Sequence, residues 1–280
     1  MALFGPDLPA FVELAPGVRR IVAPNPSMMT GPGTNTYLFG TTEIAVVDPG
    51  PRLERHIDDI VDKAGAPIRW ILATHTHPDH SPGVRPLAKR TGAEVLGRPA
   101  PDGEHQDTSF TPTRVLDDGD ALVTQEFTLT AVHTPGHASN HLCFLHEATN
   151  WLVTGDHVID GSTVVINPPD GNMKQYIASL KRVKSLSTAA FLPGHGDRID
   201  ETDRVVDWII AHRFEREDLV RVALAANPGL SAHDLVPHVY DEIPKRLYPW
   251  AERSLLAHLL KLEEDGEARC DSGRWRIDAG

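Results

Sequence analysis

The sequence predicts an α+β protein made of a strand-rich part followed by a helical part. Its 280 residues suffice for one large domain and one small one. Apolar runs of strand length recur through the first 200 residues, and Gly- and Pro-rich turns separate them. Beyond residue 200 helical patterns dominate. We therefore expect one domain over residues 1–200 and a helical domain over residues 201–280.

The first domain is expected to alternate strands with a few helices. Short apolar and β-branched runs predict strands at 18–23, 34–39, 43–48, 68–73, 93–96, 121–123, 127–133, 142–145, 151–154 and 189–192. Helices are predicted at 53–64, 84–91 and 172–186. The segment 98–114 is polar, contains three prolines and is predicted to be an exposed loop with His105 as a surface histidine. The loop 25–33 carries Met28 and Met29 and could form a wall of the active site.

The helical part has the pattern of a winged helix. Helices are predicted at 201–226, from Ala232 onward and at 250–264, and Pro228 and Gly229 separate the first two. The last helix has one apolar face, formed by leucines 255, 256, 259 and 260. The segments 267–270 and 274–277 could pair as a hairpin.

The stretch ILATHTHPDHSPG, residues 71–83, has the character of a metal-binding loop. Three apolar residues end a buried strand, and His75, His77, Asp79 and His80 follow within six positions. Imidazole nitrogens and carboxylates are the donors that zinc and similar divalent ions take. This spacing suits two adjacent ions better than one. The alternative is a solvated loop that happens to be rich in histidine.

Three further candidates repeat the order of apolar strand, turn and donor. They are His137 in TPGH, Asp156 in WLVTGD and His195 in AFLPGH. The recurrence argues against a chance accumulation of histidines. Seven donors are too many for one tetrahedral ion, so we expect two divalent ions, with zinc as the favoured metal. His133, His141 and His157 flank these motifs and are expected to support the donors or to pack.

Together, the motifs THTHPDH, TPGH, TGD and PGHG resemble those of the metallo-β-lactamase superfamily. This resemblance implies a four-layer αββα sandwich with two metals at one edge. It implies that Asp156 bridges both ions, an arrangement that true β-lactamases lack, and that Asp79 orients the attacking hydroxide and later carries its proton. The remaining ligands would divide into His75, His77 and His137 for one ion and Asp79, His80 and His195 for the other.

Two further segments, the longer of them near the end of the chain, indicate a resemblance to one subfamily in particular. NTYLF together with VYDEIPKRLYPWAERSLLAHLLKLEEDGEA is similar to the β-lactamase-like protein 2 subfamily. Members of that subfamily include an endoribonuclease that acts on single-stranded RNA, so the resemblance favours phosphodiester hydrolysis. One alternative is a thioester or lactone hydrolase of the glyoxalase II kind. The other is a metal-bound scaffold without catalytic activity.

Composition limits the partners and the compartment. The net charge is −12, which argues mildly against a broad surface for nucleic acid, although Lys181, Arg182 and Lys184 could line a local groove. Residues 200–280 contain 11 Lys and Arg against 17 Asp and Glu, so we expect this part to pack or to form a homodimer. No run of 18 apolar residues predicts a membrane span. Two distant cysteines, with Cys143 in an apolar run, and the lack of a signal peptide lead us to expect a cytoplasmic protein.

Overall fold

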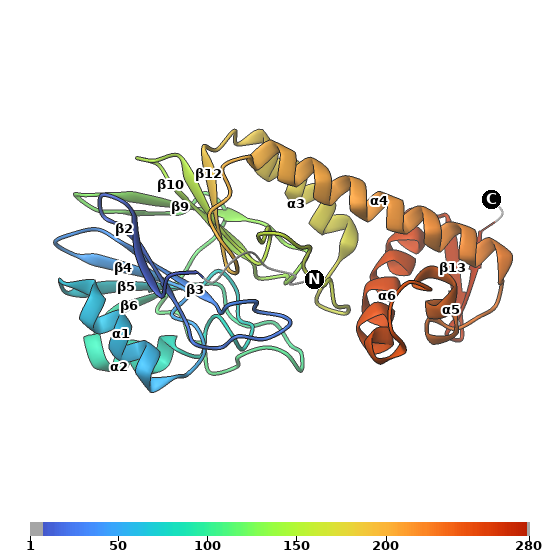
Figure 1. The fold of residues 1–280 in the computed structure, drawn as a ribbon, viewed down its shortest axis with the longest axis horizontal. Helices are drawn as coiled ribbons and strands as arrows, with labels where there is room; N and C mark the ends of the chain where they lie inside the picture. The colour runs from blue at the N-terminus through green and yellow to red at the C-terminus, as the bar shows by residue number, and fades with distance from the viewer. Residues whose placement is uncertain (1–7, 279–280) are drawn as a thin grey trace.

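Two facing β-sheets with helices on their outer sides form the first part of the chain, and a helical domain lies beside them (Figure 1). The computed structural model describes residues 8–278. The long helix α4, Thr202–Ala226, runs from the sheets to the helical domain and belongs to both. This arrangement leaves one edge of the sheets facing the helical domain.

The first sheet joins antiparallel and parallel strands in sequence order. Its strands are β1 Phe11–Ala15, β2 Val18–Val22, β3 Asn35–Phe39, β4 Ile44–Val47, β5 Ile68–Leu72, β6 Glu94–Gly97 and β7 Arg114–Val115. The strands from β4 to β7 pair in parallel, so their connections must cross over one face of the sheet. The helices α1 Glu54–Ala64 and α2 Val84–Thr91 make the first two of these crossovers.

The second sheet has the order β12-β11-β10-β9-β8. Its strands are β8 Ala121–Val123, β9 Thr128–His133, β10 Leu142–His146, β11 Trp151–Gly155 and β12 Ala190–Pro193. Only β11 and β12 are parallel, and α3, Met173–Ser185, connects them. As a result β9, β11 and β12 all end at the same edge of the sheet.

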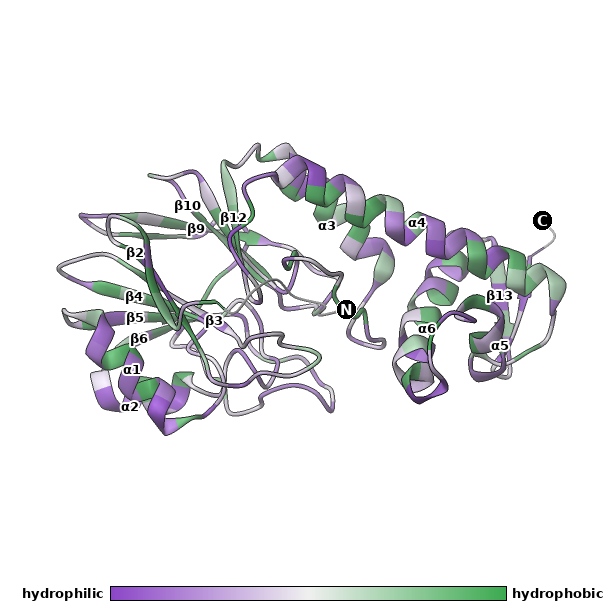
Figure 2. Ribbon diagram, viewed as in Figure 1, coloured by the Kyte–Doolittle hydropathy of each residue, from purple (hydrophilic) through white to green (hydrophobic). Residues whose placement is uncertain are grey.

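Three apolar clusters hold the four layers together. Phe39, Leu72, Phe144 and Val153 are among the buried residues between the two sheets. A second cluster lies between the first sheet and α1 and α2, and a third lies between the second sheet and α3 and α4. Figure 2 shows hydrophobic and hydrophilic residues alternating along α1, as expected for a helix with one buried face. The αββα arrangement implied by the resemblance is confirmed.

The C-terminal domain contains helices and one hairpin. After α4 come α5 Ala232–Val239, a 3₁₀ turn at Lys245–Leu247, α6 Tyr248–Glu264 and the strands β13 Ala268–Asp271 and β14 Arg274–Ile277. The strands β13 and β14 pair in an antiparallel hairpin. Leu255 and Leu259 of α6 pack with Leu224 of α4 and Trp275 of β14 in a separate apolar cluster. The predicted winged-helix pattern is confirmed.

The predicted elements agree with the structure except at two exposed edges. Strand β1 was missed because it is an edge strand whose side chains are only partly buried, with Phe11 39% exposed. The prediction of an exposed loop over 98–114 is wrong at Phe110, which is buried under the first sheet, and at Arg114, which begins β7. Cys143 lies in the core as expected. Within residues 8–278, no helix is long and apolar enough to cross a membrane.

The winged-helix cluster should depend on Leu255 far more than on surface leucines. Leu255 is fully buried, so Leu255→Ala removes apolar contacts and leaves a cavity, which should cost about 2–5 kcal/mol of unfolding free energy. Leu219 on α4 is 49% exposed, and Leu219→Ala should change the free energy by less than about 0.5 kcal/mol. Urea unfolding followed by circular dichroism at fixed metal concentration compares them. Equal effects of the two substitutions would show that α6 does not pack as described.

Candidate metal centre

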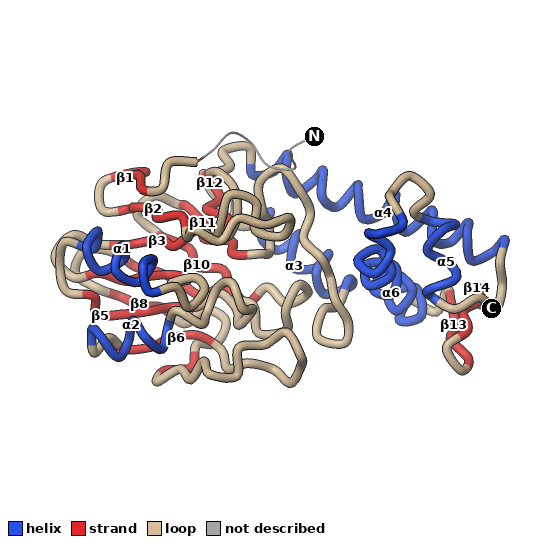
Figure 3. The backbone as a smooth tube through the Cα atoms, turned by 60° about the horizontal axis from the view of Figure 1, so that its bottom comes forward, coloured by secondary structure: helices blue, strands red, loops and turns tan. Residues whose placement is uncertain are grey.

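The predicted donors lie just after strands of both sheets. His75 follows β5 of the first sheet, whereas His137, Asp156 and His195 follow β9, β11 and β12 of the second. The donors can therefore meet only at the edge where the two sheets open together. Figure 3 shows the loops of this edge gathered between the sheets and the C-terminal helices.

The first donor group consists of three histidines. His75 Nε2 lies 3.0 Å from His77 Nδ1, and His137 Nε2 lies 2.9 Å from the same atom. One ligand atom from each residue falls within 4.8 Å of the others. The structure thus brings together the three residues that the resemblance assigned to one ion.

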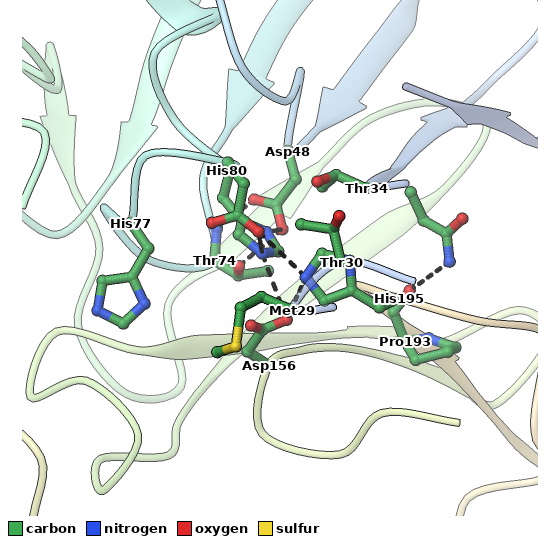
Figure 4. Close-up of polar contacts among 12 residues, drawn as sticks. Met29, Thr30, Thr34, Asp48, Thr74, His77, His80, Asp156, Pro193 and His195 are labelled. Atoms are coloured by element: carbon green, nitrogen blue, oxygen red, sulfur yellow. Dashed lines mark hydrogen bonds and ion pairs between the residues drawn. The ribbon is translucent and has the colours of Figure 1, made fainter. Parts of the chain in front are cut away.

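The second group contains Asp79, His80, Asp156 and His195, again with their ligand atoms within 4.8 Å of one another. Asp156 Oδ1 lies 3.3 Å from both His80 Nε2 and His195 Nε2, and Asp79 Oδ2 lies 3.2 Å from His195 Nε2. Figure 4 shows His80, Asp156 and His195 converging. The other carboxylate oxygen of Asp156, Oδ2, lies 3.7 Å from His137 Nε2 in the first group. Asp156 therefore faces both groups.

Hydrogen bonds at the outer ring nitrogens set the tautomers of three donor histidines. His137 Nδ1 donates to the Val165 carbonyl at 2.8 Å, and His195 Nδ1 donates to the Gly33 carbonyl at 3.2 Å. Carbonyl oxygens can only accept, so these Nδ1 atoms carry the protons. His80 Nδ1 similarly faces a carboxylate oxygen at 2.9 Å. In the neutral rings, Nε2 then presents a lone pair to the centre.

The carboxylate that faces His80 belongs to Asp48, a residue that sequence reasoning did not identify. Asp48 is 1% exposed and also accepts from the Thr74 backbone N–H and the Thr74 hydroxyl, both at 2.7 Å. Because the Thr74 hydroxyl gives its proton to Asp48, it accepts from His75 Nδ1, 3.0 Å away. One buried carboxylate therefore orients a histidine in each donor group. The sequence did offer one indication of this role: Asp48 is an acidic residue at the end of the predicted strand 43–48, which corresponds to β4, the parallel neighbour of β5.

The His195 loop is fixed by strand β3. The Asn35 side chain donates to the carbonyls of Pro193 and Gly196, both at 2.8 Å. Position 194 must be glycine, since a Cβ there would lie 2.6 Å from Asp156 Oδ1. The PGH motif thus allows the backbone to approach the donors closely.

Burial keeps the first group neutral. It lowers the pKa of His75 well below the usual value, and the neighbouring rings of His80 and His77 lower it further. Burial, followed by the proximity of His137, lowers the pKa of His77 to about 3. Burial also lowers the pKa of His137. Neutral imidazole is the form that can bind a cation.

The second group has the opposite electrostatics. Burial by itself lowers the pKa values of His80 and His195, but the negative charges of Asp79 and Asp156 outweigh this effect. As a result, the pKa of His80 is raised well above normal, and the pKa of His195 is raised to about 9. Burial by itself raises the pKa values of the Asp79 and Asp156 carboxyls, but the nearby His80 and His195 lower them by more. The pKa of Asp79 is therefore about 2, and the pKa of Asp156 lies well below normal. The two carboxylates, of which Asp156 is 12% exposed and Asp79 27% exposed, thus require positive charge beside them.

Divalent cations fit both groups. His75 Nε2 and His137 Nε2 both face one nitrogen of His77, whose single proton could satisfy only one of them. Within residues 8–278, His80 Nε2 and Asp156 Oδ1 are buried and lie 3.3 Å apart, but neither makes a hydrogen bond of regular geometry. A cation in each group would satisfy these lone pairs and neutralise the carboxylates.

The flanking histidines support or pack, as expected. His133 Nε2 lies 2.9 Å from the Ser139 carbonyl, and His141 Nδ1 lies 2.8 Å from the Thr134 hydroxyl. The His157 ring packs edge-on against Tyr176 with centroids 5.3 Å apart. None of these three histidines belongs to either donor group found among the described residues.

A cavity of about 480 Å³ opens beside the first donor group. His77 and His137 line it on one side, and Arg253 and Leu256 of α6 line it on the other. His105 also lines this cavity, so the prediction that it is only a surface histidine was incomplete. The C-terminal domain therefore contributes directly to the space in which a substrate would meet the donors.

Comparison with known proteins agrees with this geometry. The Metallo-beta-lactamase superfamily profile matches residues 29–195, and the Beta-lactamase associated winged helix domain profile matches residues 231–275. The chain is 32% identical over 277 residues to the Beta-lactamase-like protein 2 homolog of Drosophila melanogaster, covering 94% of this chain and 93% of that protein. It is 31% identical over 254 residues to the Atrochrysone carboxyl ACP thioesterase of Aspergillus fumigatus, covering 85% and 78% of the two chains. The solved structure of a beta-lactamase domain protein from Burkholderia ambifaria has a TM-score of 0.81 and 26% identity, covering 96% of this chain and 95% of that one.

Removing the charge of Asp48 should weaken metal binding without removing a donor. Asp48→Asn loses an acceptor for His80 or Thr74, so the histidines are held less firmly, and divalent-metal affinity should fall about 10- to 100-fold. Competition with a chromophoric chelator measures it. The matched control is Asp62→Asn, which changes an exposed carboxylate on α1 and should leave the affinity unchanged. An Asp48→Asn protein with the affinity of the control would refute the orienting role.

Proposed function

We propose that this chain, which belongs to the metallo-β-lactamase superfamily and carries its associated winged helix domain, is a metal-dependent hydrolase of thioesters. The observation that carries the proposal is the convergence of seven donors in two adjacent groups beside an open cavity. Two divalent ions, with zinc as the expected metal, would be held by His75, His77 and His137 and by Asp79, His80 and His195, with Asp156 contacting both. Such ions lower the pKa of a bound water toward neutrality and polarise a carbonyl oxygen.

The chemistry of Asp79 suits a thioester. Its carboxyl has a pKa of about 2, so it is ionised at neutral pH and accepts a hydrogen bond from the attacking water. The water oxygen adds to the thioester carbonyl carbon, the C–S bond breaks, and Asp79 passes the proton of the water to the departing sulfur. Thiols have a pKa of about 8.5, so the leaving group does not depend on a strong acid. An alkoxide leaving from a phosphodiester is far more basic and would need one.

The charges around the cavity also favour a substrate that is not a polyanion. Asp102, Glu104 and Asp170 line it, and Arg253 is the single Lys or Arg among its described lining residues. Lys181, Arg182 and Lys184, the residues suggested to form a basic groove on α3, are not among the cavity's described lining residues. Arg182 instead pairs with Asp118. An acidic cavity repels nucleic-acid phosphates at close range.

The relatives support the choice of substrate class. A protein 31% identical to this chain is named as a thioesterase for a substrate carried on an acyl carrier protein. The cleavage of single-stranded RNA that the subfamily resemblance favoured stays the second candidate. It shares the donor set with thioester hydrolysis, and the two are distinguished by assay.

Asp79→Asn should abolish most thioester hydrolysis. The amide cannot take the proton of the attacking water, so kcat for acetyl-N-acetylcysteamine should fall by about 10²- to 10⁴-fold. Free thiol is measured with a disulfide dye, and metal content is measured on the same samples because Asp79 is also a candidate ligand. Removal of metal by a chelator should abolish activity, and added zinc should restore it.

The same preparations are to be tested on single-stranded RNA. Wild type, Asp79→Asn and Asp62→Asn should degrade RNA equally, at the level of contaminating ribonuclease. Loss of RNA cleavage in Asp79→Asn alone, with no thioester hydrolysis by wild type, would overturn the thioester proposal in favour of phosphodiester hydrolysis.

A further inference from the structure

An apolar cavity of about 320 Å³ lies between the loop 25–33 and the C-terminal domain. Its apolar lining includes Met28, Met29, Val165, Ile243, Leu247 and Trp250. Met28, Met29 and Trp250 are 64%, 47% and 44% exposed, although large apolar side chains gathered at one place are normally covered. The volume falls within the range of small-molecule sites, roughly 300–1,000 Å³. The described structure therefore contains a wall of exposed apolar groups around a space of ligand size.

Two walls of this apolar cavity are attached to donor histidines. Val165 lines the cavity, and its carbonyl accepts the hydrogen bond from His137 Nδ1 at 2.8 Å. The loop that carries Met28 and Met29 ends at Gly33, whose carbonyl accepts from His195 Nδ1 at 3.2 Å. Figure 4 draws Met29 among the donor side chains. The apolar cavity is thus built on the backbone segments that hold one histidine of each donor group.

The charged residues at this cavity neutralise each other. Arg216 donates to Glu242 at 2.9 Å and to the Val239 carbonyl at 2.9 Å, and its guanidinium lies over the Tyr240 ring, 4.5 Å from the centroid. No other Lys, Arg, Asp or Glu is among the described residues that line the cavity. It therefore offers no unpaired charge to a ligand.

Helix α6 borders both the apolar cavity and the polar cavity beside His77 and His137. Trp250, Ala251 and Ser254 line the apolar cavity, whereas Arg253 and Leu256 line the polar cavity. These positions lie on different sides of the same two turns of the helix. A second segment also borders both spaces, because Val165 lines the apolar cavity and Asn167, two residues later, lines the polar one. A substrate with a polar reacting group and an uncharged apolar tail matches this pair of spaces.

We infer that the apolar cavity binds the acyl chain of the substrate, while its thioester lies beside the donors. The inference rests on the proposed thioester hydrolysis and adds the class of acyl group, namely an uncharged hydrocarbon chain longer than acetyl. Burying each methylene of such a chain should raise kcat/KM about fourfold. The winged helix domain then determines specificity for the acyl group.

The test compares acetyl- and octanoyl-N-acetylcysteamine on the zinc-loaded full-length protein. In wild type the octanoyl substrate should have a kcat/KM more than about 100-fold higher. Trp250→Ala should lower this octanoyl-to-acetyl ratio by at least about tenfold. Trp208→Ala is the matched control, because Trp208 is 45% exposed on α4 and lies outside both cavities, and it should keep the wild-type ratio. Binding of octanamide, measured by calorimetry, should weaken only in Trp250→Ala.

The outcomes separate this inference from the proposed function. If wild type hydrolyses both thioesters equally, or if Trp250→Ala keeps the ratio, the acyl site is refuted while thioester hydrolysis stands. If neither thioester is hydrolysed, the proposed function fails, and octanamide binding then tests the apolar site by itself. Octanamide binding that is weakened by Trp250→Ala supports the apolar site, and a lack of octanamide binding refutes it. If Trp250→Ala instead weakens binding of a single-stranded oligonucleotide and leaves octanamide binding unchanged, the cavity holds a nucleobase and the inference is overturned.

Discussion

A single buried carboxylate organises the candidate site. Asp48 is 1% exposed, so its charge must be compensated by directed hydrogen bonds, and it receives them from the Thr74 backbone, the Thr74 hydroxyl and the His80 ring. Through the Thr74 hydroxyl it also orients His75. The loop after β5 therefore cannot place its histidines freely. Asp48, at the end of the neighbouring strand β4, orients His75 and His80 through contacts that involve no cation.

The two sheets and the C-terminal domain divide the functional roles. The first sheet supplies His75, His77, Asp79 and His80 from one loop, and the second sheet supplies the remaining donors from the ends of β9, β11 and β12. The chemistry therefore depends on packing between the sheets. The winged helix lies outside this packing and contributes α6 to both cavities. Its acidic composition, which argued against binding to nucleic acid, is compatible with a role as a wall for small substrates.

The sequence predicted what depends on local pattern. Helix α2 begins at Val84 and ends at Thr91 as predicted, and the donors brought together in the structure are the seven that the motifs identified. Contacts between distant segments were not predictable in this way. Asp48 contacts His80, which lies 32 residues later in the chain, and Arg253 of the C-terminal domain lines the same cavity as His77. Neither contact produces a periodic pattern in the sequence from which it could be predicted. The buried side of Phe110 was missed for the same reason, since its surrounding segment is polar.

The central claim is that both donor groups bind a divalent ion and that Asp156 contacts both ions. Anomalous diffraction at the zinc edge, from crystals grown with zinc, tests it most directly. The account predicts two anomalous peaks about 3.5–4 Å apart, one among His75, His77 and His137 and the other among Asp79, His80 and His195, with an oxygen of Asp156 directed at each. A single peak, or an Asp156 side chain turned away from both, would contradict the account.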